Sequence, residues 1–478
     1  MVPDEGVAPS PPPGPLRRYP ELAVIVLGGL LLRLPYVLSR APLVFDDSVY
    51  FASVGAMRAG GAPFRDVFSS QGPAFLPLIW LGDRLGGRTD WSPRLVPLIA
   101  GLVLIVLVHR LGLRVSNRAG AGIAAVLAAT SGSLVYASDR LVSDGITITF
   151  ATGAILAACD PRTRRVVAAA ILLGLGLATK SIFMLPAGLA VAWLVWRRRG
   201  VLAAVGVGAL AAVVSVVVAI PWGLRAVWDQ YVELHLRVRS STSSADNVDL
   251  VRDVLRQYDR LLLGIALVAV VTVVWRRVRA EKGPIAPEPV LDVALWLWLI
   301  GGLVVLRVQH PVFIQHIGML IPPVALLIAR ARPPLVPVAV VALVLLPVHL
   351  HGAGVRRSEV QPTAGERAAI ARLEQLTPRD GLVISDEPML VWLAGRTTPG
   401  SMVDLSYVRI AAGDLTVDDV RRAAEEPGVC AVLLWSGRLE SLPRLEDQLA
   451  DYHEVAPVDG RRLLVRSGCS DGVGQQSN

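Results

Sequence analysis

Long apolar stretches alternate with short arginine-rich stretches along the first 350 residues of the chain. A helix needs about 17 to 25 residues to cross a membrane, and eleven apolar runs reach or approach that length. They cover residues 21–38, 93–109, 120–137, 145–159, 166–179, 182–196, 201–221, 260–275, 290–306, 312–329 and 334–350. The pair 166–179 and 182–196 is far too long for a single span, so we predict a tight hairpin that turns at ATKS (178–181). The pattern predicts a polytopic α-helical membrane protein.

Five basic clusters occur after every second apolar run and predict the orientation of the helices. They are HRLGLRVSNR (109–118), DPRTRR (160–165), WRRRG (196–200), WRRVRAEK (275–282) and ARARPP (329–334). Arginine and lysine are enriched in cytoplasmic loops, and Arg17 and Arg18 precede the first run. An N-terminus inside the cell therefore places all five clusters inside.

Residues 73–87 are the exception that tests this order, because a span there would move all five clusters outside. The segment is short and contains Asp83 and Arg84, so we expect an interfacial or re-entrant helix on the outer side. The segments that then lie outside are 39–92, 138–144, 179–181, 222–258, 307–311 and everything after about 351.

The chain after about residue 360 has the pattern of a soluble domain. GLVIS (381–385), VCAVLLW (429–435) and RRLLVR (461–466) predict strands, and TVDDVRRAAEE (416–426) and LPRLEDQLADY (442–452) predict amphipathic helices. Thr416 is the expected N-cap of the first of these helices. We predict a small extracytoplasmic α/β domain over residues 360–468, and expect disorder in the Pro-rich cytoplasmic segment 1–19 and in the tail 469–478.

Composition agrees with a membrane protein and excludes some other classes. The chain is 53% hydrophobic and 18% charged, whereas soluble domains have about 25% charged residues. The net charge of +8 comes almost wholly from arginine, because Lys180 and Lys282 are the two lysines. No motif indicates nucleic-acid binding, and no Cys or His spacing indicates a metal site. Cys430 and Cys469 could pair if both lie outside, a question that the sequence leaves open.

Two adjacent acidic residues, Asp46 and Asp47, follow the first apolar run. Behind them Tyr50, Val54 and Met57 recur at helical spacing, so we expect a helix over 47–59 that lies in the membrane interface. One aspartate can cap this helix. Capping does not account for the second.

Further polar residues fall in the segments predicted to lie outside. Asp139, Arg140 and Asp144 share one turn, where an ion pair between Arg140 and Asp144 at i, i+4, or capping by Asp144, competes with a functional role. Lys180 lies in the predicted hairpin turn, where it either snorkels to the surface or offers a compact charge to a phosphate. Later, RVQHPVFIQHIGMLIPP (307–323) brings together Arg307, His310, Gln315 and His316, which makes an anion site plausible.

The stretch FDDSVYFASVGAMRAGGAPFRDVFSSQGPAFLPLIW (45–80) resembles the first exterior loop of GT-C glycosyltransferases, and most nearly that of the protein O-mannosyltransferase and aminoarabinose-transferase types. That loop typically carries an acidic pair, an aromatic residue, a YRD-like motif and a juxtamembrane helix with proline. SDRLVSDG, LATKS and HPVFIQHIGMLIPP extend the resemblance over most of residues 20–350. The resemblance implies a GT-C transmembrane catalytic domain there, with about eleven spans plus juxtamembrane helices.

The resemblance also implies a reaction, namely inverting transfer of a sugar from a polyprenyl phosphate to an acceptor hydroxyl on the outer face of the plasma membrane. A phosphate leaving group needs no general acid, but the acceptor needs a base, which maps to Asp46. Asp47 replaces a more frequent glutamate, and its negative charge would raise the pKa of Asp46. Lys180, with Arg140 or His316, would hold the phosphate. The substrate-binding residues expected in all are Asp47, Tyr50, Gln71, Asp139, Arg140, Asp144, Lys180, His310 and His316.

Neither the sugar nor the acceptor, whether protein, lipid or glycan, follows from one sequence. Relatives differ in metal use, and no ligand cluster in this chain calls for a metal. A transporter or flippase of lipid-linked sugars is the main alternative, and a polymerase or ligase of envelope sugars is another. Transporters tend to place charge near the membrane midplane. The polar residues here are expected at one rim, which favours the enzyme.

Overall fold

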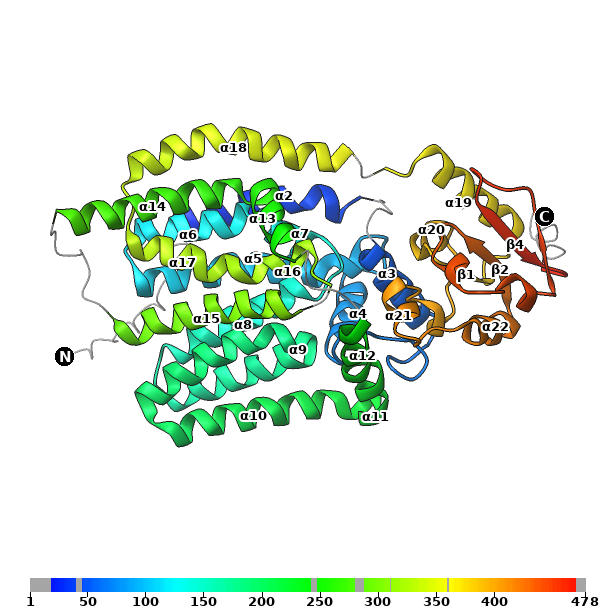
Figure 1. Ribbon diagram of the computed structural model, residues 1–478, viewed down its shortest axis with the longest axis horizontal. Helices are drawn as coiled ribbons and strands as arrows, with labels where there is room; N and C mark the ends of the chain where they lie inside the picture. The colour runs from blue at the N-terminus through cyan, green and yellow to red at the C-terminus, as the bar shows by residue number, and fades with distance from the viewer. Residues whose placement is uncertain are drawn as a thin grey trace, which may run out of the picture.

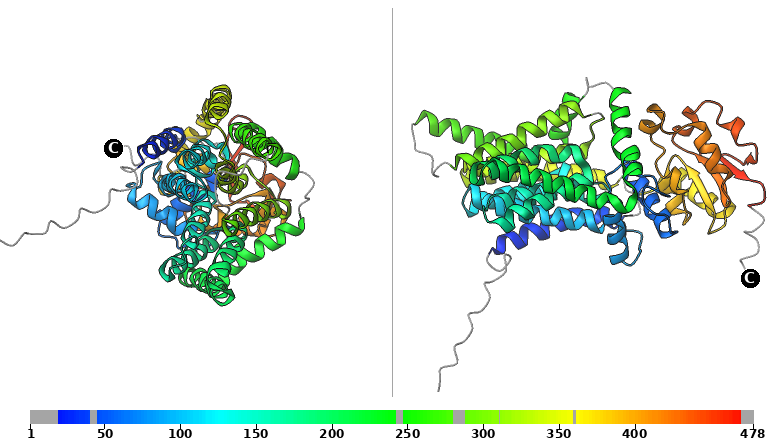
Figure 2. Two further views of the ribbon diagram at one scale, coloured as in Figure 1. Left: turned by 90° about the vertical axis from the view of Figure 1, so that its left-hand side faces the viewer. Right: turned by 90° about the horizontal axis from the view of Figure 1, so that it is seen from below.

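The computed structural model describes residues 19–39, 45–241, 247–279, 288–309, 311–358 and 361–469. Long helices form a bundle, and a small α/β domain sits at one end of it (Figure 1). Viewed along its long axis, the bundle shows its helices running close to parallel (Figure 2). Four short helices, α3 (Phe45–Arg58), α4 (Phe75–Leu85), α11 (Leu224–Val227) and α12 (Leu234–Ser241), lie where the bundle meets the domain.

The remaining elements of the first 358 residues are mostly the long helices of the bundle. They are α2 (Pro20–Val37), η1 (Ser92–Arg94), α5 (Leu95–Val115), α6 (Arg118–Thr130), α7 (Gly132–Asp139), α8 (Asp144–Ala158), α9 (Thr163–Arg199), α10 (Val201–Ala219), η2 (Ile220–Trp222), η3 (Trp228–Glu233), α13 (Asn247–Tyr258), α14 (Arg260–Val278), α15 (Pro289–Val308), α16 (Ile314–Ile317), η4 (Gly318–Leu320), α17 (Ile321–Ala331) and α18 (Leu335–Ser358).

The hairpin predicted at ATKS is present within α9. Lys180 has non-helical backbone angles, with φ −157° and ψ 94°. At the far end, Arg199 Nη1 donates to Thr163 Oγ1 at 3.0 Å, so the first and last residues of α9 lie together. A Cβ atom at Gly176 would collide with the sulfur of Met184, which shows how closely the two halves pack. The helix therefore turns back on itself at Lys180, as predicted.

Seven helices within the described residues are long and apolar enough to cross a membrane, or eight if α6 and α7, bent by 57°, form one span. Asp144–Ala158 and Leu335–Leu350 are shorter apolar helices. When the bent pair counts as one pass and the two halves of α9 count separately, these segments correspond to the eleven predicted runs. The helix α4, with 11 residues, is not among these segments, and its place outside the membrane stays a prediction.

The described parts of the five basic clusters gather at the end of the bundle away from the α/β domain (Figure 1). Hydrogen bonds and an ion pair connect them: Ser116 Oγ to the Ala329 carbonyl at 2.6 Å, Arg276 Nη1 to the Ala331 carbonyl at 2.8 Å, Arg198 Nη1 to the Ala158 carbonyl at 3.2 Å, and Arg330 Nε to Asp292 Oδ1 at 2.9 Å. A shared end is what the alternation of apolar runs and basic clusters requires.

The α/β domain is built around a four-stranded sheet with strand order β1-β2-β4-β3. β1 and β2 are parallel, and the other pairs are antiparallel. Its elements are α19 (Ala364–Leu376), β1 (Leu382–Ser385), α20 (Pro388–Leu393), η5 (Gly400–Met402), α21 (Tyr407–Ala411), α22 (Val417–Glu425), β2 (Val429–Leu434), η6 (Leu439–Ser441), η7 (Glu446–Gln448), β3 (Tyr452–Glu454) and β4 (Arg462–Arg466). Every residue of β2 is buried, which explains its continuous apolar sequence.

Within this domain the predicted strands are present, and Thr416 caps α22 through a capping box with Asp419. The predicted helix at 442–452 is wrong. Leu442, Leu445 and Leu449 are buried at helix-like spacing, but Pro443 lacks the N–H that a helix needs and Arg444 has a φ of +59°. The segment forms short 3₁₀ turns and then β3.

The structure also answers the question left open about the cysteines. Cys430 of β2 and Cys469 form a disulfide with a Cα–Cα distance of 5.5 Å, and they are 39 residues apart in the chain. Cys159 is a buried free thiol. The bond links the middle of the sheet to the last described residue.

The helix α3 is present where it was predicted, but it does not lie on the surface. Tyr50, Val54 and Met57 are all buried. The ring centroids of Tyr50 and Phe75 are 4.8 Å apart, and those of Phe51 and Trp392 are 5.1 Å apart. The expected interfacial helix is therefore an internal one, enclosed by α4 and by α20 of the α/β domain.

Candidate active site

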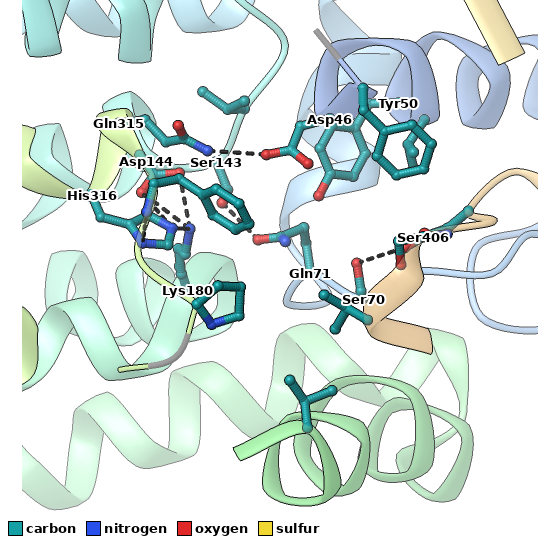
Figure 3. Close-up of a pocket in the computed structure, with 18 of the residues that line it drawn as sticks. Asp46, Tyr50, Ser70, Gln71, Ser143, Asp144, Lys180, Gln315, His316 and Ser406 are labelled. Atoms are coloured by element: carbon teal, nitrogen blue, oxygen red, sulfur yellow. Dashed lines mark hydrogen bonds and ion pairs between the residues drawn. The ribbon is translucent and has the colours of Figure 1, made fainter. Parts of the chain in front are cut away.

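A cavity of about 410 Å³ lies between the end of the bundle and the α/β domain. Segments far apart in the chain supply its polar lining, and Figure 3 shows ten of the residues labelled. Polar lining residues include Asp46, Tyr50, Ser70, Gln71, Ser143, Asp144, Lys180, His235, Gln315, His316, Asp404, Ser406, Tyr407 and Arg438. Of the expected site residues, Asp46, Tyr50, Gln71, Asp144, Lys180 and His316 come together here.

Asp46 lies in the first turn of α3 and faces the cavity (Figure 3). Gln315 Nε2 donates to its Oδ2 at 3.0 Å. Removal of the carboxylate from water raises the pKa of Asp46 to about 6, an effect that Lys180 opposes and that Asp404 and Asp144 strengthen. Asp47 is not among the leading causes of this shift, so the expectation that its charge raises the pKa of Asp46 gains no support here.

Asp47 points away from the cavity and is fully buried. It forms an ion pair with Arg94, which is also buried, and its Oδ1 accepts from the Leu141 N–H at 2.6 Å. Because consecutive residues of a helix point in directions about 100° apart, the two aspartates face different surroundings. Asp47 therefore does not take the substrate-binding place expected for it, because its charge and hydrogen bonds are used within the protein.

The structure also changes the capping interpretation of this pair. Because α3 begins at Phe45, both aspartates lie in its first turn. Negative charge there is favourable near the positive end of the helix dipole, but this holds for both residues and distinguishes neither.

Lys180 carries the cationic charge at the opposite side of the cavity from Ser70 and Ser406 (Figure 3). Its Nζ lies 2.9 Å from Asp144 Oδ2 and 3.2 Å from His316 Nε2. The ion pair between Arg140 and Asp144, one of the alternatives considered for this turn, does not form, because Asp144 pairs with Lys180 instead.

The break in α9 lets Lys180 reach the cavity, and the loop before α4 supports that break. The Gly72 N–H donates to the Thr179 carbonyl at 3.1 Å, and the Ala74 N–H donates to the Ala178 carbonyl at 2.9 Å. A Cβ at position 72 would collide with the Ala178 carbonyl oxygen. Glycine is therefore required where this loop closes over the turn.

Asp139 and Arg140 do not line the main cavity, contrary to expectation. They line a separate crevice of about 50 Å³. Arg140 Nη1 donates to Asp139 at 2.8 Å, and its guanidinium lies 3.9 Å from the ring centroid of Tyr36 and 3.7 Å from that of Tyr136. Arg140 is thus held by its neighbours outside the cavity. His310, the remaining expected residue, lies outside the described residues.

Comparison with known proteins identifies the architecture. Residues 70–224 match the family model described as dolichyl-phosphate-mannose-protein mannosyltransferase. ArnT from Cupriavidus metallidurans bound to undecaprenyl phosphate superposes with a TM-score of 0.64 at 16% identity, covering 95% of this chain and 99% of that chain. The chain has the GT-C fold. The resemblance drawn from the sequence is thereby confirmed.

A second GT-C structure agrees over much of its length. The archaeal oligosaccharyltransferase AglB from Archaeoglobus fulgidus, in complex with an inhibitory peptide and a dolichol-phosphate, superposes with a TM-score of 0.53 at 13% identity. The match covers 95% of this chain and 75% of that chain. No curated protein sequence matches significantly. The family that the model describes is one of glycosyltransferases, and so are both of these structural neighbours.

The GT-C cavity contains residues that the sequence did not single out. Gln315 belongs to the motif at 307–323, but nothing in that motif predicts its hydrogen bond to Asp46. Asp404, Ser406, Tyr407 and Arg438 come from the α/β domain, and no local pattern marks them as functional. Across the described part of the chain, no group of three or more His, Cys, Asp or Glu side chains is arranged to hold a metal ion.

Proposed function

We propose that this protein is an integral-membrane glycosyltransferase. It moves a sugar from a polyprenyl phosphate to an acceptor hydroxyl on the extracytoplasmic face, with inversion at the anomeric carbon. The observation that carries the proposal is that a carboxylate, Asp46, and an ammonium group, Lys180, face one cavity at the end of a membrane bundle. ArnT with undecaprenyl phosphate and AglB with a dolichol-phosphate lend support, because both share this fold.

Lys180 is suited to hold the phosphate of the donor. An ammonium group is a compact charge with three donors, and the contact with Asp144 fixes its position. The N–H of Phe313 donates to His316 Nδ1 at 3.2 Å, and Nε2 of the same ring lies 3.2 Å from Lys180 Nζ, so His316 helps to hold the ammonium group in place. Lys180 thus faces the place where a phosphate oxygen would bind, and it stabilises the negative charge that grows as the phosphate leaves.

Asp46 is suited to act as the general base. The acceptor O–H gives its proton to the carboxylate while its oxygen attacks the anomeric carbon, and the bond from that carbon to the phosphate oxygen breaks. The lipid phosphate leaves with the electron pair as a stable anion, so no acid is required. The hydrogen bond from Gln315 orients the carboxylate, and its raised pKa makes it a stronger base than an ordinary aspartate.

The extracytoplasmic location belongs to the same proposal, and two observations support it. The basic clusters lie at the end of the bundle away from the cavity, as expected of a cytoplasmic side. The Cys430–Cys469 disulfide lies in the domain at the cavity end, and disulfides persist in oxidising surroundings. The donor must be lipid-linked on that side, because nucleotide sugars are cytoplasmic.

The proposal is tested with purified protein in proteoliposomes and labelled polyprenyl-phosphate sugars. The wild type is expected to cleave the donor and pass the label to membrane acceptors or to water. Lys180→Gln should weaken binding of polyprenyl phosphate by roughly 10- to 100-fold, the value of a hydrogen-bonded charge. Arg84→Gln, on an exposed side chain stacked on Trp80, is the matched control. Movement of intact lipid-linked sugar across the bilayer without cleavage would instead support a flippase.

A further inference from the structure

The cavity has a second polar wall that the proposed mechanism does not use. We call the cavity-lining residues Asp404, Ser406, Tyr407 and Arg438 of the α/β domain the domain wall. Ser406 of this wall and Ser70 of the transmembrane part lie together, across the cavity from Lys180, with Gln71 between (Figure 3). The domain therefore contributes to the site itself and does not merely cover it.

Asp404 is the acidic residue of the domain wall, and it has no cation of its own. It is 6% exposed. Among the described residues, its carboxylate forms no ion pair. The nearby Arg409 donates to the main-chain oxygen of Asp404 at 2.6 Å and pairs with Asp414 at 2.9 Å. A buried carboxylate without a cation is costly, so its retention beside an open cavity points to a ligand.

Two of the acceptor positions of the Asp404 carboxylate have a structural role, and its other acceptor positions are available to a ligand. The N–H of Ser406 donates to Oδ1 at 3.1 Å, in the turn that leads into α21. Ser70 Oγ donates to Oδ2 at 3.3 Å, so this bond joins the domain to the transmembrane part. An ionised carboxylate has about four lone-pair sites. Two are occupied, and the others remain for donors in the cavity.

The chemistry of these groups fits the hydroxyls of a carbohydrate ring. A carboxylate accepts from two neighbouring hydroxyls at once and repels a phosphate. The hydroxyl of Ser70 donates to Asp404 and can still accept from a ligand hydroxyl, which suits a neutral polyol. Tyr407 is 52% exposed and offers an aromatic face on which the apolar side of a sugar can pack.

We propose that Asp404, assisted by Ser70, binds a pair of hydroxyls on a sugar ring and makes the α/β domain a determinant of sugar specificity. This inference rests on the proposed function. The same hydroxyl chemistry can belong to the sugar of the donor or to a sugar in the acceptor. The donor's phosphate binds at Lys180 and its sugar extends toward Asp46, so either ring can reach the domain wall.

Asp404→Asn is the decisive variant, because the amide oxygen keeps the turn to Ser406 while the charge is lost. Asp380→Asn, at an exposed site of the same domain, is the matched control. Ser70→Ala tests the assisting hydroxyl. In the donor arm, binding of plain polyprenyl phosphate is compared with binding of polyprenyl-phosphate hexose and pentose. In the acceptor arm, octyl glycosides and octanol serve as acceptor probes.

For Asp404→Asn we expect unchanged binding of plain polyprenyl phosphate and a loss on the order of 10- to 100-fold in one arm. A loss in the donor arm affects only sugar-bearing lipids, whereas a loss in the acceptor arm abolishes the preference for glycosides over octanol. Ser70→Ala should act in the same arm, more weakly. Weaker binding of plain polyprenyl phosphate, or no change in either arm, overturns the inference. If the wild type itself neither binds nor cleaves sugar donors, the proposed function has failed instead.

Discussion

Replacement of Asp46 by asparagine separates the proposed base from every structural role of the same side chain. The amide has nearly the same shape, and its oxygen can still accept from Gln315 Nε2, which lies 3.0 Å from the carboxylate in the wild type. The variant cannot take a proton from the acceptor. A general base contributes about 10²- to 10⁴-fold to a rate, so we expect kcat to fall by that factor while donor binding changes little.

The pH dependence of the reaction supplies a second readout. Because burial raises the pKa of Asp46 to about 6, the carboxylate is ionised above that pH and protonated below it. The wild-type rate should therefore fall about tenfold per pH unit below pH 6 and level off above it. The residual activity of Asp46→Asn should show no such transition near pH 6.

The same pKa predicts a gain in stability for the variant. In the unfolded chain the carboxyl has its ordinary pKa of 3.8, whereas in the folded protein the pKa is about 6. Between these values the unfolded state releases the proton first, so stability falls as the pH rises from 4 to 6 and stays lower above it. Two pKa units correspond to about 3 kcal/mol, an upper value for what Asp46→Asn should regain at pH 8.

Both effects are measured on one preparation, with donor cleavage as the assay and thermal unfolding in detergent as the control. Lost activity together with an equal or higher melting temperature is the result expected for a partly buried base, because most single substitutions destabilise a protein. Wild-type activity in Asp46→Asn refutes the mechanism. A wild-type pH profile whose transition lies near pH 4 also refutes it, because about 4 is the pKa of an ordinary aspartate.

Three further predictions concern the frame of the site. Asp47→Asn leaves the buried Arg94 unpaired and should lower the free energy of unfolding by about 3–5 kcal/mol; a melting temperature equal to the wild type contradicts this. Cys430→Ser opens a loop of 39 residues and should destabilise the α/β domain by about 2–4 kcal/mol, seen as faster proteolysis than in the wild type without reductant. A cysteine replacing Arg88 should react with an impermeant maleimide on intact cells, and one replacing Arg164 only after permeabilisation. The opposite labelling reverses the orientation.

The transmembrane part follows from the sequence because the bilayer imposes one simple requirement. Each span must be apolar, and each turn of this chain that is predicted to be cytoplasmic carries arginine. The hairpin at Lys180 could be predicted for the same reason, since 166–196 is too long to be one span, while each of its apolar halves approaches the length of a span. Parity of the basic clusters likewise predicts that α4 lies outside the membrane.

The local sequence pattern does not reveal what an element packs against where a second domain covers it. The stripe of Tyr50, Val54 and Met57 looks the same whether it faces lipid or a protein neighbour, and α3 proved to be enclosed by α20. In the segment 442–452, the spacing of the leucines predicts a helix, but Pro443 argues against one because proline removes a helix hydrogen bond. The leucines are buried in the core of the domain, as a helix would have placed them, but 3₁₀ turns bring them there.

The domain wall could not be predicted from the sequence for a different reason. Asp404 follows Val403 and precedes Leu405, both fully buried, so its surroundings in the chain resemble those of any aspartate in a turn. What distinguishes it is the hydrogen bond from Ser70, a residue of the loop between α3 and α4. Such contacts between distant segments leave no trace in local periodicity or charge.

The adjacent aspartates of α3 have different roles: Asp47 holds the helix in place, and Asp46 faces the cavity. The ion pair of Asp47 with Arg94, and its bond from the Leu141 N–H, tie α3 to the start of α5 and to the turn before α8. That turn leads to Asp144, the partner of Lys180. Neighbouring residues of a helix keep a fixed relative orientation. The contacts that hold Asp47 therefore also fix the direction of Asp46 relative to Lys180 across the cavity. The second carboxylate, which capping does not explain, therefore acts as the anchor that holds the first toward the cavity.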